Sequence, residues 1–316
     1  MNDSSKVSLG LAEAERKTVF LCAGWALCSV LIFTVLAFLP SAVQDSGLMM
    51  SRTLLKIGAF AIATALCWRN AKEASIVSGQ VVWQAIAVGL GFYALGDIVT
   101  LLWQLLWGLS STAALSNVFH GISYVFLAIG LVNAILPRQT SLSLPQTLGI
   151  ATIGILGIVL ASWITFHAPK VSNQVSNPIN TSPNSSVITA DTPTPSHQAA
   201  PPLIKTIDNR LQPIAQNMGL LYIAGDCMLI VMAAALLVAF WGGTYSEAWK
   251  LISLAGLCLY VADMFMVYHQ GQGSHTPGAF WEIFWILSAL FFGLGASVEH
   301  GVSAQMKQKR TRQQWI

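Results

Sequence analysis

From Trp83 the chain reads WQAIAVGLGFYALGDIVTLLW, and from Trp249 it reads WKLISLAGLCLYVADMFMVYH. The two stretches align without a gap, so that Trp83 matches Trp249 and Asp97 matches Asp263. Each stretch is long and apolar enough to cross the hydrocarbon core of a bilayer as a helix. The alignment therefore predicts a duplicated membrane unit that carries one carboxylate per copy inside the membrane.

A second apolar segment follows each of these stretches, and the two second segments also align. The first reads SNVFHGISYVFLAIGLVNA from Ser116, and the second reads WEIFWILSALFFGLGAS from Trp281. The matched positions are Phe119 with Phe284, Ser123 with Ser288, and Gly130 with Gly295. The predicted repeat thus extends over at least two consecutive helices.

The composition is typical of a chain that lies mostly in lipid. Hydrophobic residues make up 54% of the chain and charged residues 9%, whereas roughly 25% of residues are charged in a soluble domain. The formal net charge is only +3, and the densest basic segment is KQKRTR at 307–312. Nucleic-acid binding needs a broad basic face, so we expect the lipid bilayer and not nucleic acid as a partner.

Apolar runs of about 20 residues, the length that crosses a bilayer, predict eight membrane spans. The spans lie near residues 18–40, 50–68, 81–107, 113–136, 145–166, 217–241, 249–270 and 278–300. We therefore expect an all-α, polytopic bundle of transmembrane helices. Residues 18–138 and 139–300 form two repeats of four spans each, and an even number of spans gives both repeats the same orientation in the membrane.

Eight spans place the two terminal segments, 1–17 and 301–316, on the same side. Basic residues favour the cytoplasmic side, so the basic tail predicts a multi-pass protein of the inner (plasma) membrane with both termini in the cytoplasm. Segment 168–216 then lies outside. Its Ser, Thr, Asn and Pro content predicts disorder, with 204–216 as a short helix at the membrane interface.

Ionisable residues inside the predicted spans mark the candidate site, because each costs about 2.5–3.5 kcal/mol at the centre of a bilayer. Such residues occur on several spans, all in the outer half. They are Asp97, His120, Asp226, Asp263 and Glu282.

Each intramembrane aspartate also has a tyrosine three or four residues before it, which places the ring one turn away on the same helix face. The pairs are Tyr93 with Asp97, Tyr222 with Asp226, and Tyr260 with Asp263. Aromatic rings beside carboxylates suit a pocket for a small ligand or a cation. We predict a ligand-binding site from these residues together with His120 and Glu282. Two alternatives are that the acids only hold neighbouring helices together, or that they translocate ions or protons.

His120 and His269 are both expected in the outer leaflet, on helices of different repeats. Facing histidines of this kind can ligate copper or haem iron. No further partner is found at matching depth, so we expect no cofactor and keep metal ligation by these two histidines as an alternative.

The paired units resemble the multi-helix N-terminal membrane regions that precede diguanylate cyclase or histidine kinase domains in some bacterial signalling proteins. The resemblance covers 81–136 and 249–300, with Asp97 and Asp263 in tyrosine-containing helices and Asn117 where an acid is usual. No output domain follows the last helix, so the resemblance implies a stand-alone sensory module that signals to a separate cytoplasmic or membrane partner.

Other classes of function remain open. Gly96-Asp97 with His120 and Tyr124 resembles the eight-span lysoplasmalogenase-like family, which implies a lipid hydrolase, although no GxSxG, HExxH or P-loop pattern is present. A small-molecule or ion transporter also uses parallel repeats with a site near the midplane. A structural or assembly partner in a membrane complex would need no ligand. We expect a receptor-like module and not an enzyme.

Overall fold

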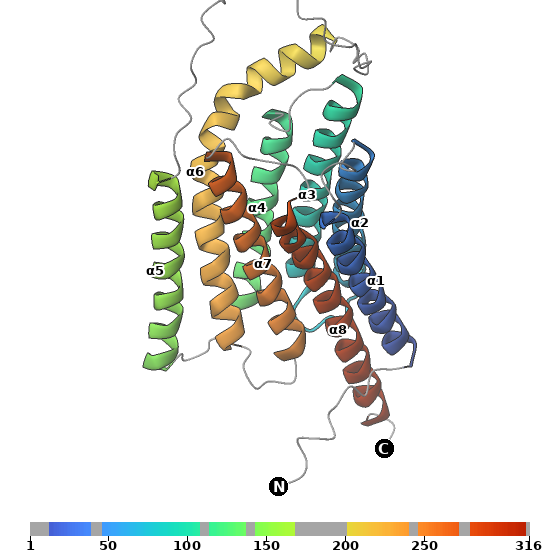
Figure 1. Ribbon diagram of the computed structural model, residues 1–316. Helices are drawn as coiled ribbons and strands as arrows, with labels where there is room; N and C mark the ends of the chain where they lie inside the picture. Colours follow the sequence, from blue (N-terminus) through green and yellow to red (C-terminus); the bar gives the residue numbers. More distant parts are fainter. Residues whose placement is uncertain are drawn as a thin grey trace, which may run out of the picture.

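A computed structural model describes residues 13–38, 46–107, 114–136, 143–167, 201–239, 246–271 and 279–313. Within these ranges the chain forms eight α-helices and one short 3-10 helix, without any strand (Figure 1). The elements are α1 Glu13–Ala37, α2 Ser46–Lys72, α3 Gln80–Trp107, α4 Ala114–Ile135, α5 Leu144–His167, α6 Pro202–Ala239, α7 Ser246–Gly271, η2 Phe280–Glu282 and α8 Ile283–Gln313. The prediction of an all-α helical bundle is confirmed.

Each of the eight α-helices contains a stretch long and apolar enough to cross a membrane, from 19 residues in α6 to 28 in α3. The eight stretches lie close to the eight spans expected from the sequence. Many apolar side chains on their outer surfaces are exposed, as suits helices whose solvent is hydrocarbon. The chain is thus an integral, multi-pass membrane protein.

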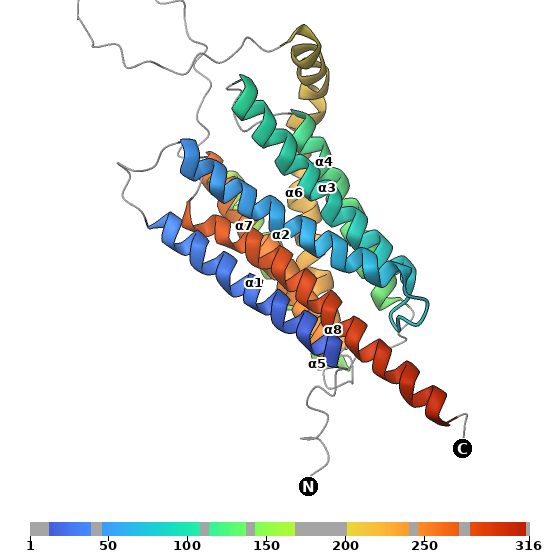
Figure 2. The same cartoon turned by 90° about the vertical axis from the view of Figure 1, so that its right-hand side faces the viewer.

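Six of the described helices pack in a closed cycle. In this cycle α2 packs against α3, α3 against α4, α4 against α6, α6 against α7, α7 against α8, and α8 against α2. The two remaining helices are peripheral: α1 packs mainly on α8, and α5 packs on α6 and α7 (Figures 1 and 2). Side chains from six helices can therefore meet inside the cycle.

The two matched helix pairs make their close approach through matched residues. A Cβ atom added to Gly130 of α4 would lie 2.7 Å from Ile86 Cγ1 of α3, and one added to Gly295 of α8 would lie 2.7 Å from Ile252 Cδ1 of α7. Ile86 matches Ile252 in the alignment of the two stretches. Both close approaches therefore use matched positions, and the duplication of the unit stays a prediction.

The aligned tryptophans also meet. Trp83 and Trp249 are both fully buried, and their ring centroids are 6.0 Å apart. By contrast, the first helices of the two predicted repeats pack differently, since α1 contacts α8 of the other repeat and α5 contacts α6 and α7 of its own. The correspondence in packing therefore covers the last three helices of each predicted repeat.

The start of α1 and the end of α8 lie at the same end of the bundle, and the start of α6 lies at the opposite end (Figure 1). This arrangement agrees with the expected placement of both termini on one side; which side is cytoplasmic stays a prediction. The last helix runs past its predicted span of 278–300 and continues to Gln313, so most of the predicted tail is helical.

Helix α6 begins at Pro202, inside the segment 168–216 that was expected to be disordered apart from a short helix at 204–216. Residues 168–200 lie outside the described part. The expected short helix at 204–216 is the first section of α6, and this section leans across the end of the bundle before the helix turns down (Figure 1). Pro213 lies inside α6, and proline bends a helix because it lacks the backbone N–H and its ring clashes with the preceding turn. The Ser- and Thr-rich composition that predicts disorder ends before this helix starts.

Candidate functional site

Polar and aromatic side chains from six helices converge inside the cycle of helices. We call this group the polar cluster. Its members are Lys56 of α2, Tyr93 and Asp97 of α3, His120 and Tyr124 of α4, Tyr222 and Asp226 of α6, Asp263 of α7, and Trp285 of α8. All nine residues lie within the apolar spans. They sit toward the starts of α2, α4 and α8, in the half of the bundle away from the start of α1.

An ion pair forms one side of the polar cluster. Lys56 Nζ lies 2.7 Å from Asp97 Oδ1, and Asp97 is only 3% exposed. His120 Nε2 lies 3.5 Å from the same carboxylate oxygen. The Lys56 ammonium also sits 4.3 Å from the centre of the Trp285 ring, where the ring face attracts a cation. A buried carboxylate needs such a partner, because an unpaired charge in a low-dielectric interior is very costly.

Two acids form the other side. The Tyr124 hydroxyl lies 2.8 Å from Asp226 Oδ1 and is also within hydrogen-bonding distance of Asp263 Oδ2. The Trp285 indole N–H donates to Asp263 Oδ1 at 2.8 Å. One hydroxyl from α4 therefore bridges carboxyl groups of α6 and α7.

Each of the two Gly-Asp pairs lets an α4 ring approach its carboxylate. A Cβ on Gly96 would lie 2.5 Å from His120 Nε2, and a Cβ on Gly225 would lie 2.8 Å from Tyr124 Cδ1. His120 and Tyr124 are one turn apart on the same face of α4. The two glycines thus explain how α4 places one ring against the carboxylate on each side of the polar cluster.

Two of the predicted tyrosines line the polar cluster. Tyr93 stacks on Phe60 with ring centroids 4.2 Å apart, and its ring lies 4.6 Å from that of His120. Tyr222 lies with its ring 5.7 Å from that of Tyr124 and donates its hydroxyl hydrogen to the carbonyl oxygen of Asn117 at 2.5 Å. The structure therefore brings together Tyr93, Tyr222, His120 and the three aspartates expected from the sequence.

Three predicted residues lie elsewhere. Tyr260 donates its hydroxyl hydrogen to the carbonyl oxygen of Gly157 at 2.8 Å, so its hydroxyl fastens α7 to the peripheral helix α5. Glu282 lies half-buried in the short helix η2, just before the start of α8. His269 stacks on Trp281 at 5.7 Å. Within the described ranges, no group of three or more His, Cys, Asp or Glu side chains is arranged to hold a metal ion.

Sequence reasoning missed Lys56, Tyr124 and Trp285 as members of the site. Lys56 lies near one end of its span, where a lysine can reach the membrane surface, and here it turns inward to Asp97. The alignment carried a signal for Trp285, because it matches His120 in the other repeat. His120 lies beside Asp97 and Trp285 bonds to Asp263, so each of the two aligned rings contacts one of the two aligned aspartates.

At the other end of the bundle, α8 holds the turn between α2 and α3, residues 73–79. The Ser78 N–H donates to Glu299 Oε1 at 3.2 Å, and the Val77 N–H donates to Ser303 Oγ at 3.3 Å. Asn70 at the end of α2 donates its side-chain amide to the Ala296 carbonyl oxygen at 2.8 Å. Backbone groups that a turn leaves unpaired are thus satisfied by α8.

The same turn carries a carboxylate outside the membrane spans. The Ser75 side chain and backbone N–H both bond to the Glu73 carboxylate, and these bonds hold the pKa of Glu73 below its usual value. The Lys307 ammonium, 3.6 Å from Glu73 Oε1, lowers this pKa further. The carboxylate is therefore ionised at neutral pH and ties α8 to the turn.

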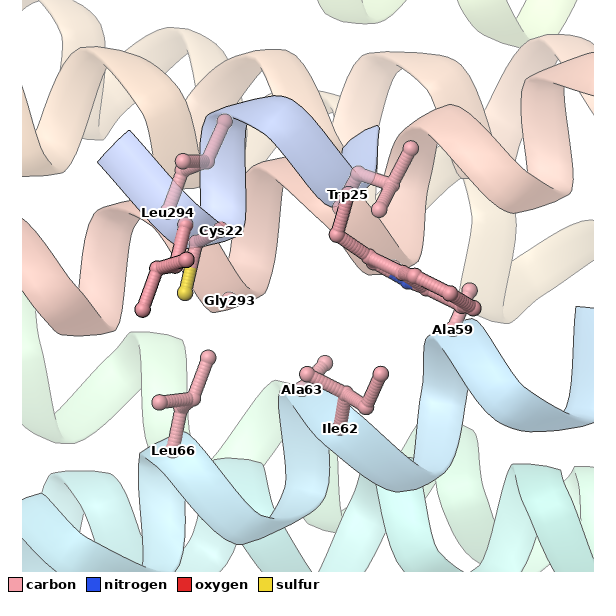
Figure 3. Close-up of a pocket in the computed structure, with 11 residues that line it drawn as sticks. Cys22, Trp25, Ala59, Ile62, Ala63, Leu66, Gly293 and Leu294 are labelled. Carbon is pink, nitrogen blue, oxygen red and sulfur yellow. The ribbon is translucent and has the colours of Figure 1, made fainter. Parts of the chain in front are cut away.

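A separate apolar groove opens between α1, α2 and α8, with a volume of about 250 Å³ (Figure 3). Its lining includes Trp25, Ala59, Ile62, Leu66 and Leu294. None of the lining residues belongs to the polar cluster, so the groove and the polar cluster are distinct features.

Comparison of this chain with protein-family models, with curated proteins and with solved structures finds no match.

Proposed function

We propose that this integral membrane protein is a receptor-like sensory module, and that the polar cluster is the site at which it senses a change of charge. The observation that carries the proposal is the bridge of Tyr124 between Asp226 and Asp263. It joins α4 of one predicted repeat to α6 and α7 of the other. Electrostatic interactions are strong in this low-dielectric setting, so a gained or lost charge there alters how the helices are held together.

The helix α8 supplies a route from the polar cluster to the opposite end of the bundle. Trp285, near its start, bonds to Asp263 and lies beneath the Lys56 ammonium. Glu299 and Ser303, on the same helix, hold the turn 73–79. The rise of 1.5 Å per residue separates Trp285 from Glu299 by about 21 Å. Because an α-helix is stiff over this length, a shift at Trp285 is passed to the turn.

The receiver of the signal is proposed to be a separate protein at that end of the bundle. The turn 73–79 and the end of α8 lie together there, and Lys307 is 66% exposed. This reading agrees with the resemblance to membrane sensor regions of signalling proteins. The ligand would bind at the polar cluster and the partner at the opposite end of the bundle, beside the turn 73–79. Allosteric coupling requires two distinct sites of this kind.

Hydrogen exchange at the turn tests the proposal. Asp263→Asn removes a charge from the polar cluster and should speed exchange of the Val77 and Ser78 amides by about tenfold or more, which corresponds to about 1.4 kcal/mol of lost protection. Mass spectrometry of the protein in nanodiscs resolves the peptide that contains 73–79.

The matched control is Glu247→Gln, which makes the same chemical change on the same helix. Glu247 is 73% exposed and pairs with Lys250 at the surface, and exposed pairs of this kind contribute little. Unchanged exchange is expected for the control. If Asp263→Asn alters exchange only within α7 and leaves the turn unaffected, the polar cluster is a packing device and the proposal fails.

A transporter is the second candidate, and one observation favours it. Side chains from both predicted repeats meet inside the bundle, since the Lys56 ammonium lies over the Trp285 ring and Tyr124 bridges Asp226 and Asp263, as in transporters whose site lies between two repeats. Flux assays in proteoliposomes separate the two functions: a transporter moves substrate or protons across the membrane, and loses that flux in Asp263→Asn. A sensory module responds at the turn 73–79 and supports no flux.

A further inference from the structure

We infer that the Asp226–Asp263 pair binds one proton. On this side of the polar cluster, the proton takes the place of the positive charge that Lys56 brings to Asp97 on the other side. This inference names the ligand of the proposed sensing site. It rests on the proposed function for its biological consequence, whereas proton binding itself is measured separately.

The two sides of the polar cluster differ in charge although their frameworks match. Asp97 and Asp263 are aligned residues, and each has an aligned α4 or α8 ring beside it, His120 or Trp285. The helix that precedes each aspartate's helix contributes Lys56 on one side and Asp226 on the other. The first side is therefore an ion pair, and the second side is a pair of acids.

Counting hydrogens at Tyr124 shows what the pair of acids needs. A phenol has one hydrogen to donate, yet the Tyr124 oxygen lies within hydrogen-bonding distance of both Asp226 and Asp263. If Tyr124 donates to one carboxyl group, it can only accept from the other. Both contacts become hydrogen bonds only when one of the two carboxyl groups carries a proton.

The remaining contacts assign that proton to Asp226. Asp263 accepts at both oxygens, from the Trp285 N–H and from Tyr124, as an ionised carboxylate does. Asp226 is fully buried, and its Oδ2 has no hydrogen-bond partner among the described residues. A bare carboxylate oxygen in this setting is far more costly than the carbonyl oxygen of a neutral acid. The chain of bonds therefore runs from the Asp226 hydroxyl to Tyr124, and from Tyr124 to Asp263.

Other titratable groups face this pair from the neighbouring helices. They are Lys56 of α2, Tyr93 and Asp97 of α3, His120 of α4, Tyr222 and Cys227 of α6, and Tyr260 of α7. Lys56 and Asp97 neutralise each other, and the tyrosines are neutral. The proton on Asp226 thus leaves one negative charge on the pair of acids, at Asp263, and His120 beside Asp97 adds a positive charge only when it is protonated.

Loss of the proton has a structural consequence. Two adjacent carboxylates repel, and Tyr124 can then donate to only one of them, so its bond to either Asp226 or Asp263 is lost. The bond that holds three helices together exists only in the protonated state. A rise in pH removes the proton from Asp226, and a cationic ligand that binds the Asp226 carboxylate displaces it. Either change breaks one of the two Tyr124 bonds.

Infrared spectroscopy with ¹³C-labelled aspartate tests the inference directly. The wild-type protein in nanodiscs at neutral pH should show the C=O stretch of a protonated aspartic acid. Asp226→Asn should remove the band, and because an amide is the same size as a neutral acid and can donate to Tyr124, this variant should fold normally. Glu247→Gln should leave the band unchanged. Absence of the band in the wild-type protein overturns the inference, as does its persistence in Asp226→Asn.

Stability supplies the second readout. If the folded protein holds one more proton than the unfolded chain, the folding equilibrium constant falls about tenfold for each unit that the pH rises above about 4, where a free aspartate ionises. The decline ends at the pH at which the folded pair releases the proton. Asp226→Asn should remove this one-proton component of the slope. An equal slope in both proteins contradicts the inference.

The two proposals fail in different ways. If the infrared band is present but exchange at the turn 73–79 ignores Asp263→Asn, the proton site stands and the sensory function falls. If the band is absent while exchange at the turn responds, the sensory function stands with a different ligand.

Discussion

At the scale of single residues, the chemistry of this protein depends on small side chains that let polar ones meet. Gly96 and Gly225 each precede an aspartate and leave room for a ring of α4. The rings of His120 and Tyr124 then reach the carboxylates directly. Glycine serves here through the absence of a side chain, because both positions lie inside regular helices.

A methyl group at Gly96 should therefore disturb the polar cluster. Gly96→Ala places a Cβ 2.5 Å from His120 Nε2, and overpacking of this kind costs about 1–3 kcal/mol. The matched control is Gly58→Ala in α2, where nothing lies within 4 Å of the added Cβ and the gain in helix propensity makes alanine neutral or slightly stabilising. Thermal unfolding in detergent should show a lower Tm for the first variant only. Equal Tm values would show that His120 moves aside freely.

At the scale of elements, α8 is the helix that links the two ends of the bundle. Its span is 72% buried, against 11% for that of α1, and it packs against α1, α2 and α7. It touches the polar cluster through Trp285 and the turn 73–79 through Glu299 and Ser303. Figure 2 shows this helix extending beyond its neighbours at the end where the chain finishes.

The contact between α8 and the turn 73–79 should weaken in acid. The pKa of Glu73 is held below its usual value by its bonds to Ser75, and Lys307 lowers it further. A carboxylate of this kind contributes stability above the pKa that it has in the unfolded chain, and that stability is lost as the pH falls through the lower pKa of the folded state.

Local exchange measurements provide the check on this pH dependence. Protection of the turn amides should change little between neutral pH and about pH 5, and below about pH 4, where a free glutamate becomes protonated, it should fall a few-fold beyond the intrinsic change in exchange rate. Glu73→Gln should be less protected at neutral pH and should lack this extra fall. A wild-type protein whose turn protection is independent of pH would rule out a role for the Glu73 carboxylate.

At the scale of the whole molecule, the apolar runs were enough to predict the eight helices and their alternating directions. Hydropathy determines where a chain crosses a bilayer, so the spans followed directly. The short helix at 204–216 and the span at 217–241 were expected as separate segments, because a polar segment joined to an apolar one does not reveal in sequence that both form one helix. The peripheral packing of α1 and α5 could not be predicted either. All faces of their membrane spans are apolar, so the sequence does not show which face packs against the bundle.

The candidate site was predictable in part for a related reason. An aspartate inside an apolar run indicates a functional or structural role, because placing an ionisable residue in the bilayer costs free energy. Asp97, Asp226 and Asp263 were found in this way. Their partners are set by contacts between helices: Lys56 reaches Asp97 from α2, and Tyr260 turns its hydroxyl to α5. Spacing along one helix places a tyrosine near an acid, but it cannot show which neighbouring helix receives the hydroxyl.

The central claim is that the bridge at Tyr124 holds the two halves of the bundle in one state, and that α8 reports that state at the turn 73–79. The most direct test is amide exchange at Val77 and Ser78 in Tyr124→Phe, with Tyr260→Phe as the control. Each variant removes one buried hydroxyl that bonds between helices. The account predicts that exchange at the turn rises about tenfold or more, or about 1.4 kcal/mol, in Tyr124→Phe and stays unchanged in Tyr260→Phe. Equal behaviour of the two variants at the turn would contradict it.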